Sequence, residues 1–96
     1  MKLEFNSNGE DKGSIEIDFK NDSRTFLRPS GSLTIRTEGG KAIMEKKIGE
    51  FLVLPGHHRP LTKNFSLPNP GKYSATVILD FGAEERVGAR IFFNRN

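Results

Sequence analysis

The stretch SLPNPGKYSATVILDFG, residues 66–82, decides the fold, because a strict alternation of apolar and polar residues follows its Pro70-Gly71 pair. Successive side chains of a β-strand point to opposite faces, so the alternation predicts a strand with one buried and one solvated face. Four apolar side chains on one face indicate a central strand of a sheet. We predict that Tyr73, Ala75, Val77 and Leu79 face inward and that Ser74, Thr76, Ile78 and Asp80 face outward.

Similar alternating runs occur along the chain, separated by turn residues every ~8 to 12 positions, which is typical of an all-β sandwich. Strands are predicted within residues 2–5, 13–20, 31–37 and 86–95, and the double glycine in residues 38–41 favours a tight hairpin. About seven strands result, with no helix and no internal repeat. In these strands, the following residues are predicted to face the core: Leu3, Phe5, Ile15, Ile17, Phe19, Leu33, Ile35, Val87, Ala89, Ile91 and Phe93.

Residues 41–56, KAIMEKKIGEFLVLPG, admit two interpretations. Met44, Ile48 and Phe51 have the spacing of one stripe of a helix. A glycine in a helix interior costs about 1 kcal/mol, however, and Gly49 interrupts the segment, which also lacks an opening capping residue. We therefore predict a strand, followed by a turn at the Pro-Gly pair that ends the segment.

Residues 58–68, HRPLTKNFSLP, also leave two alternatives open. Leu61 and Phe65 can both face the core if Lys63, which lies between them, points inward as well. The other possibility is a β-bulge that shifts the alternation by one residue. Pro60 lacks an amide hydrogen, so it confines this part of the chain to a strand start, an edge strand or a bulge.

The composition excludes several classes of protein. The 96 residues carry 34% hydrophobic side chains and no cysteine, so we expect one modest core without disulfides or thiolate metal sites. No apolar run approaches the ~18 to 20 residues that span a bilayer, and the first residues lack the apolar stretch of an export signal, so no membrane insertion is expected. The net charge of +3 is spread along the chain, so we expect no nucleic-acid partner.

Tyr73 is the only tyrosine and stands near the start of the predicted penultimate strand. In immunoglobulin-like sandwiches a tyrosine at this place buries its ring between the sheets and returns its hydroxyl to the upstream backbone, an arrangement known as the tyrosine corner. Pro70 and Gly71 set the angle at which the chain enters the strand. We assign a structural role to these three residues.

Three segments resemble, in their order, the immunoglobulin-like modules of bacterial exported proteins, including the C-terminal domain of proteins similar to periplasmic pilus-assembly chaperones. They are RPSGSLTIRTEGGK (28–41), FLVLPGHHRPL (51–61) and PGKYSATVILDFG (70–82). The resemblance implies an immunoglobulin-like antiparallel β-sandwich and an extracytoplasmic location, periplasmic or at the cell surface. It implies no shared ligand or reaction. A chaperone role would need a second domain and the cleft between the two, for which 96 residues leave no room.

The sequence offers no catalytic pattern and no convincing metal site. His57 and His58 point to opposite faces of an extended chain, and two imidazoles without a third ligand bind a metal weakly. Glu16 and Asp18 share one strand face, but we expect an exposed convex sheet there, with no pocket to raise the pKa of one carboxyl for acid catalysis. No Gly-x-Ser-x-Gly motif and no cysteine nucleophile occur. We therefore expect neither an enzyme nor a cofactor.

Asp80, Glu84 and Glu85 surround a predicted turn, and their carboxylate oxygens could hold a hard cation such as Ca²⁺. The residues do not have the spacing of an EF-hand loop. The alternative is a simple charged loop.

The predicted last two strands carry the most suggestive surface feature. The alternation turns Ile78 outward, and it turns Phe92 outward on the next strand, beside Arg86 and Arg90. Apolar residues on an otherwise solvated face can mark a contact with another domain or chain, although single exposed apolar residues are also common. The adjacent pair of Phe92 and Phe93 also leaves open which of the two rings is buried. We predict an interaction face at these four residues.

We expect residues 1–96 to form a single immunoglobulin-like domain that is excised from, or part of, a longer bacterial exported protein. Its function would be that of a non-catalytic structural or protein-interaction module, which presents loops at residues 56–60 and 82–86 to another protein or a neighbouring domain. One alternative is a carbohydrate-binding module, although few aromatic residues are available for a sugar platform. The other is a pilus-chaperone-like domain that binds subunits by strand donation at a sheet edge.

Overall fold

The computed structural model describes residues 1–9, 11–81 and 86–95, and these residues form seven β-strands and no helix. None of the described segments is therefore a helix that could cross a membrane. The strands are β1 (Lys2–Ser7), β2 (Lys12–Lys20), β3 (Ser30–Thr37), β4 (Ala42–Ile48), β5 (His58–Ser66), β6 (Gly71–Asp80) and β7 (Arg86–Arg95).

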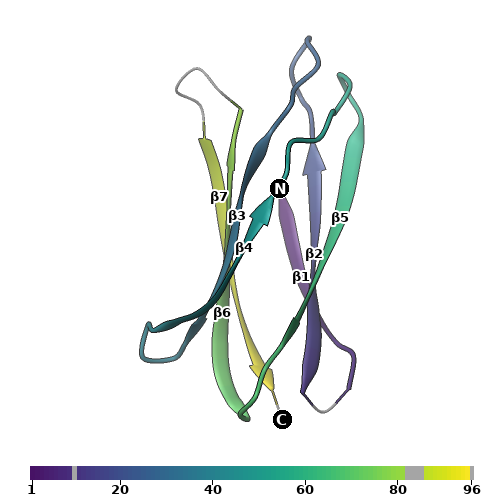
Figure 1. The fold of residues 1–96 in the computed structure, drawn as a ribbon. Coiled ribbons are helices and arrows are strands. Elements are labelled where there is room, and N and C mark those ends of the chain that lie inside the picture. The colour runs from purple at the N-terminus through teal and green to yellow at the C-terminus, as the bar shows by residue number, and fades with distance from the viewer. Residues whose placement is uncertain (10, 82–85, 96) are drawn as a thin grey trace.

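The strands form two antiparallel sheets that pack face to face (Figure 1). One sheet has the order β1-β2-β5, and the other has the order β4-β3-β6-β7. Both sheets contribute residues to a single hydrophobic core. The architecture is an immunoglobulin-like antiparallel β-sandwich, as the alternation and the position of the tyrosine predicted.

β6 is a central strand, since it pairs with β3 on one side and with β7 on the other. Its predicted inward residues, from Tyr73 to Leu79, are all buried in the core. Phe93 of β7 is also buried, whereas Val87, Ala89 and Ile91 are only half-buried. The difference follows from the position of β7 at the edge of its sheet, where no further strand covers these smaller side chains.

Tyr73 forms the predicted tyrosine corner. Its side chain is only 6% exposed, and its hydroxyl donates a hydrogen bond to the backbone oxygen of Asn69. The phenol ring stacks on Phe93, with 5.9 Å between the ring centroids. Gly71 has φ of +143°, a conformation that favours glycine, so the Pro-Gly pair has the conformational role that the sequence suggested.

The strand interpretation of residues 41–56 is confirmed for Ala42–Ile48, whereas the residues after Ile48 form no strand beyond a single bridge at Val53. β4 ends before Gly49, and the following residues continue in the same direction toward the start of β5, beside the segment that precedes β3 (Figure 1). Val53 pairs with Leu27 through two reciprocal backbone hydrogen bonds of 2.9 Å each. Phe51 and Val53 are buried in the core, so the apolar residues that resembled a helical stripe reach the core from a strand and an extended loop.

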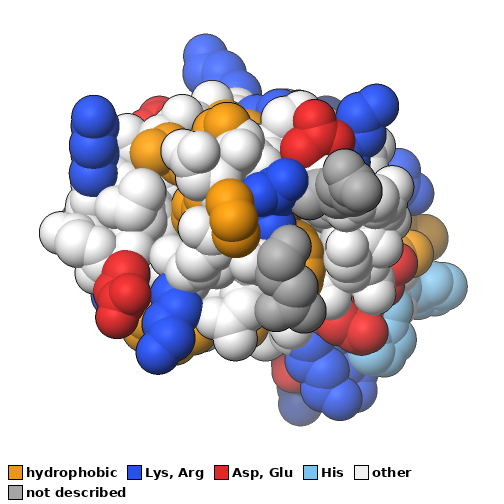
Figure 2. Space-filling view, turned by 90° about the horizontal axis from the view of Figure 1, so that it is seen from below, with side chains coloured by type: hydrophobic (Ala, Val, Ile, Leu, Met, Phe, Trp, Pro, Cys, Tyr) orange, Lys and Arg blue, Asp and Glu red, His pale blue; other side chains and the backbone are white. Residues whose placement is uncertain are grey.

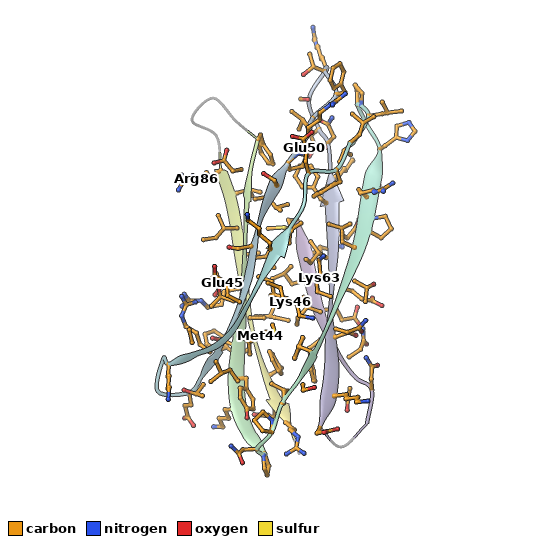
Figure 3. All side chains as sticks on the ribbon, viewed as in Figure 1. Met44, Glu45, Lys46, Glu50, Lys63 and Arg86 are labelled. Atoms are coloured by element: carbon orange, nitrogen blue, oxygen red, sulfur yellow. The ribbon has the colours of Figure 1, made fainter. Side chains whose placement is uncertain are left out.

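β5 contains no bulge. It pairs with β2 in continuous register, and Lys63 lies directly opposite the inward-facing Ile15, so Lys63 shares the inner face with Leu61 and Phe65. Across the open side of the sandwich, Lys46 of β4 donates a hydrogen bond to the backbone oxygen of Asn64 (Figure 3). Inward-pointing lysines on edge strands discourage the addition of further strands, which explains why these two positions are charged.

The predicted extent of the loop at residues 56–60 is wrong. β5 already begins at His58, which pairs with Lys20, and Pro60 lies within the strand opposite Asp18. The proline is tolerated because β5 is an edge strand, so one side of it needs no ladder hydrogen bonds. The connection therefore ends at His57. The second expected loop, at residues 82–86, lies outside the described residues except for Arg86.

Asn21 joins three segments of the chain just after β2. Its side chain is fully buried, and its amide nitrogen donates hydrogen bonds to the backbone oxygens of Thr25 (2.8 Å) and Val53 (2.9 Å). Its side-chain oxygen accepts hydrogen bonds from the backbone and the hydroxyl of Ser23. Its own backbone also pairs with that of Gly56 and His57. Asn21 thereby satisfies buried polar groups in a part of the molecule that lacks regular sheet pairing.

Candidate functional site

The four predicted interaction residues all lie on the outer face of the four-stranded sheet, but only Arg90 and Phe92 line one hollow there. Residues directly opposite each other in an antiparallel pair share a face, and Ile78 lies opposite Gly88 while Arg86 lies opposite Asp80. Phe92 and Arg90 follow on the same face of β7. Phe92 is 79% exposed and Ile78 is 44% exposed. The predicted placement of these side chains is therefore confirmed, whereas their role in binding stays a prediction.

The two arginines of this face have different surroundings. Arg86 forms an ion pair with Asp80, with 3.4 Å between Nε and Oδ2. Arg90 instead donates a hydrogen bond from Nε to the Thr76 hydroxyl at 3.0 Å. This bond fixes the stem of Arg90 over β6 and leaves the terminal nitrogens of its guanidinium for other partners.

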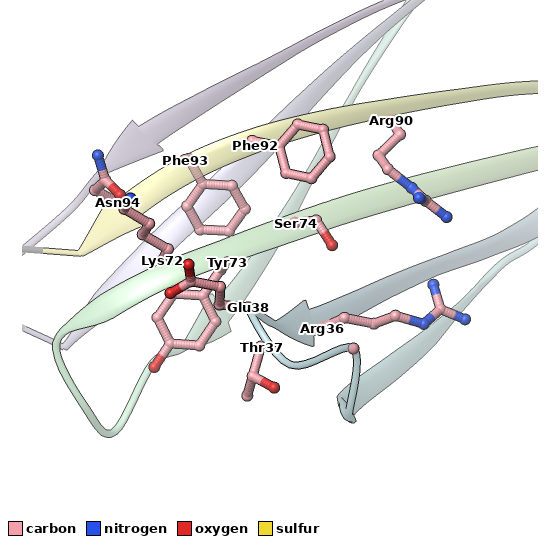
Figure 4. A pocket seen from close by; sticks show the side chains of 11 residues that line it. Arg36, Thr37, Glu38, Lys72, Tyr73, Ser74, Arg90, Phe92, Phe93 and Asn94 are labelled. Atoms are coloured by element: carbon pink, nitrogen blue, oxygen red, sulfur yellow. The ribbon is translucent and has the colours of Figure 1, made fainter.

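A hollow of about 540 Å³ lies on this face, near the β3–β4 hairpin and the start of β6 (Figure 4). Phe92 stands at its edge, and Ser74 lies beneath it, only 8% exposed, between Arg36 and Phe92 in the cross-strand row. The charged and amide side chains that line the hollow are Arg36, Glu38, Lys72, Arg90 and Asn94. The hollow thus combines one exposed aromatic ring with an excess of cationic groups.

Arg36 is the residue of this site that sequence reasoning missed. The alternation correctly turned it outward on its strand, but nothing in the sequence showed that β3 pairs with β6, which in turn pairs with β7. That order places Arg36 in one row with Ser74 and Phe92. The pairing order of strands depends on long-range packing, so no local signal could have joined residues 36 and 92.

Charged side chains at the lower end of the molecule are mixed in sign. Figure 2 views the sandwich from this end and shows Lys and Arg side chains around the periphery with Asp and Glu side chains between them. On this view no single-sign surface of the kind that binds a nucleic-acid backbone is evident.

The predicted histidine pair is solvent-exposed. His58 lies with Nδ1 3.2 Å from Oδ1 of Asp18, and His57 belongs to the preceding connection. Among the described residues, no three His, Cys, Asp or Glu side chains lie together in a way that could hold a metal ion. The suggested cation site involves Glu84 and Glu85, which lie outside the described residues.

The surface around Glu16 and Asp18 differs from the expected convex sheet. A second hollow of about 480 Å³ lies over β1, β2 and β5, and both carboxylates contribute to its lining. It forms because side chains of the neighbouring strands, including Lys2 and Pro60, rise on either side of β2. The expectation that this surface has no depression was wrong, since it considered one strand without its neighbours.

A second exposed apolar group lies on the loops at the end of the sandwich that holds Asn21. Phe26 is 58% exposed, and Leu52 and Leu54 are about half exposed. The bridge between Leu27 and Val53 turns these three side chains away from the core. The guanidinium of Arg28 lies 5.7 Å from the centroid of the Phe26 ring. This loop patch gives a natural comparison for the sheet face.

Fold and surface together define the class of this protein as an immunoglobulin-like β-sandwich with an exposed aromatic and cationic sheet face. No protein-family model matches the sequence, and no curated protein matches it significantly. A solved structure of a β-glucuronidase from glycoside hydrolase family 2 is similar to 98% of this chain, with a TM-score of 0.65 and 9% sequence identity. The chain spans only 12% of the length of that enzyme. At this identity the similarity concerns the fold alone.

Proposed function

We propose that this domain is a non-catalytic interaction module that binds another protein or a neighbouring domain through the outer face of β3, β6 and β7. The extracytoplasmic bacterial setting is part of the proposal, and its support is the resemblance to immunoglobulin-like modules of exported proteins. The resemblance to pilus-chaperone-like domains stays a prediction.

The observation that carries the proposal is the exposure of Phe92, 79%, next to Arg90 on the outer face of a hydrogen-bonded sheet that also carries Ile78. Aromatic residues and arginine are enriched at protein interfaces, and a large aromatic side chain in solvent gains most when a partner covers it. The sheet holds these side chains in place before binding, so little ordering is needed on association. The face therefore has the composition and the rigidity of a binding surface.

The similarity to part of a much longer enzyme supports the view of the fold as one unit of a multi-domain chain. It also favours the second candidate, a carbohydrate-binding module, because the enzyme is a glycosidase. The hollow beside Phe92 supplies one aromatic ring and several polar side chains, which a sugar could use. A single exposed ring is a small platform, so protein binding remains the first proposal.

The test uses the protein as it occurs in its natural host and compares three forms of it: the unchanged protein, the double variant Ile78→Ser/Phe92→Ser and the control variant Phe26→Ser. Hydrogen exchange and cross-linking coupled to mass spectrometry identify the partner domain or protein. We expect the contact with the partner to be lost in the double variant and kept in the control.

Loss of the contact in Phe26→Ser, but not in the double variant, would place the binding site at the loop patch around Phe26. Contact that survives both substitutions would contradict the proposal. A glycan array probed with the same three forms tests the second candidate, which predicts a signal that depends on Phe92.

A further inference from the structure

Two guanidinium groups lie on the same side of β6, although their residues come from strands that do not pair with each other. Arg36 of β3 lies opposite Ser74, and Arg90 of β7 lies opposite Thr76, two residues further along β6. Figure 4 shows both side chains extending toward the same end of the hollow. Two like charges in this position repel each other, which costs free energy unless an anion lies between or beside them.

Neither guanidinium has an acidic partner in the part of the chain that the structure describes. Arg28 and Arg86, in contrast, form ion pairs with Glu50 at 3.7 Å and with Asp80 at 3.4 Å. Arg36 is half-buried, and Arg90 uses only its Nε, toward Thr76. The remaining N–H groups of the two arginines have the fork geometry that suits a carboxylate.

The surroundings of the pair define the ligand further. Phe92 lies next to the two arginines in the hollow and presents a largely exposed apolar ring. Glu38, the carboxylate that lines the same hollow, lies toward its other end, near Tyr73 (Figure 4). Lys72 adds a third cationic side chain to the lining. The site is therefore positive at the arginine end and apolar beside it.

We propose that the hollow binds an acidic peptide segment of the partner protein, with a carboxylate held by Arg36 and Arg90 and a neighbouring apolar side chain packed on Phe92. This inference rests on the proposed function and specifies the chemistry of the partner. Charge complementarity selects a carboxylate, and the single ring fits one apolar side chain better than an extended sugar chain. Side chains two residues apart in an extended peptide share one face, as Arg90 and Phe92 do on β7, so the carboxylate and the apolar side chain come from residues i and i+2 of the peptide.

The test titrates the isotope-labelled domain with two synthetic peptides and follows its amide chemical shifts by NMR. One peptide is acetyl-Ser-Glu-Ser-Phe-Ser-Glu-Gly-amide, which in extended form presents its Glu and Phe side chains on one face, and the control peptide has Gln in place of Glu. We expect shifts around Ser74, Thr76 and Phe92, and an affinity for the acidic peptide about tenfold above that for the control. The affinity should fall steeply on raising the salt concentration to about 1 M.

Three variants assign the effect to the arginine pair. Arg36→Gln and Arg90→Gln should each weaken binding of the acidic peptide about tenfold. Arg59→Gln, which removes an exposed arginine from the other sheet, should leave the affinity unchanged. Because the affected side chains lie on the surface, we expect all three variants to stay folded, which the same NMR spectra verify.

The proposal is overturned if the acidic peptide causes no shifts, if both peptides bind equally, or if the Arg36 and Arg90 variants bind as the unchanged domain does. Shifts in the hollow with polygalacturonate, in the absence of peptide binding, would replace the peptide by a carbohydrate. If the natural partner is lost in Ile78→Ser/Phe92→Ser but kept in Arg36→Gln/Arg90→Gln, the proposed function stands and the acidic ligand is wrong.

Discussion

The two ends of the sandwich are stabilised in different ways. At the end that holds Tyr73, four aromatic rings from both sheets pack together, and Phe5 stacks on Phe93 with 4.1 Å between the ring centroids. Phe65 lies 6.2 Å from both of these rings, and Tyr73 closes the group. Apolar packing between the sheets therefore dominates at this end.

The opposite end depends on hydrogen bonds of irregular backbone. Three phenylalanines meet there, with Phe19 at 6.2 Å from Phe51 and at 5.3 Å from Phe81. The two loops above them have no sheet pairing apart from the bridge between Leu27 and Val53. The buried side chain of Asn21 adds hydrogen bonds that join these two loops. The end formed by loops is thus stabilised by a buried polar side chain that hydrogen-bonds to the backbone. The end formed by paired strands is stabilised mainly by the packing of aromatic rings.

The largest expected effect is the removal of the tyrosine ring. Tyr73→Ala deletes a buried aromatic side chain between the sheets, so we expect the free energy of unfolding to fall by about 3 to 5 kcal/mol. Chemical denaturation followed by circular dichroism measures the change. A loss of less than about 1 kcal/mol would show that the aromatic rings at this end contribute little to stability. It would contradict the proposed difference between the two ends.

Removal of the asparagine side chain should have a somewhat smaller effect. Asn21→Ala removes the hydrogen bonds that the side-chain amide donates to the backbone oxygens of Thr25 and Val53, each of which keeps one other donor, and it removes the acceptor of the Ser23 backbone amide. We expect a loss of about 2 to 4 kcal/mol. Hydrogen exchange should increase first at residues 53–57 and stay slow in β6. Asn21→Asp is the matched control, because it keeps the acceptor but lacks the amide donors, and it should not restore the stability.

Tyr73→Phe separates the ring from the hydroxyl. The ring stays, and only the hydrogen bond to the backbone oxygen of Asn69 is lost. We expect a loss of about 1 kcal/mol, the usual net value of one hydrogen bond. A loss as large as that of Tyr73→Ala would indicate that this end, too, depends mainly on its polar contact.

The smallest effect on stability is expected for substitution of Phe92, which precedes the buried Phe93. Phe92 points away from the core and is largely exposed, so Phe92→Ser should change the free energy of unfolding by less than about 0.5 kcal/mol. Phe93→Ser, at the adjacent buried position, is the control and should cost several times more. Equal losses for the two variants would contradict the assignment of inner and outer faces on β7.

Much of the fold was predictable because alternation is a local property. The inward residues of β2, β3 and β6 and the two-faced character of β7 could be read from a period of two, and the tyrosine corner could be identified from one residue and the turn before it. The exposure of Ile78 and Phe92 followed from the same period. These features need only the chain direction and the preference of apolar side chains for a core.

The sequence by itself determined which side chains face the core, that the chain forms strands, and that an aromatic residue stands on the outer face of the last strand. Only the tertiary structure decided that β3, β6 and β7 lie side by side, which places Arg36 beside Arg90 and Phe92. It also decided that Lys63 points inward and that Asn21 connects two loops. The physical reason is that each of these contacts joins residues far apart in the chain, and their free energy depends on the packing of the whole sandwich.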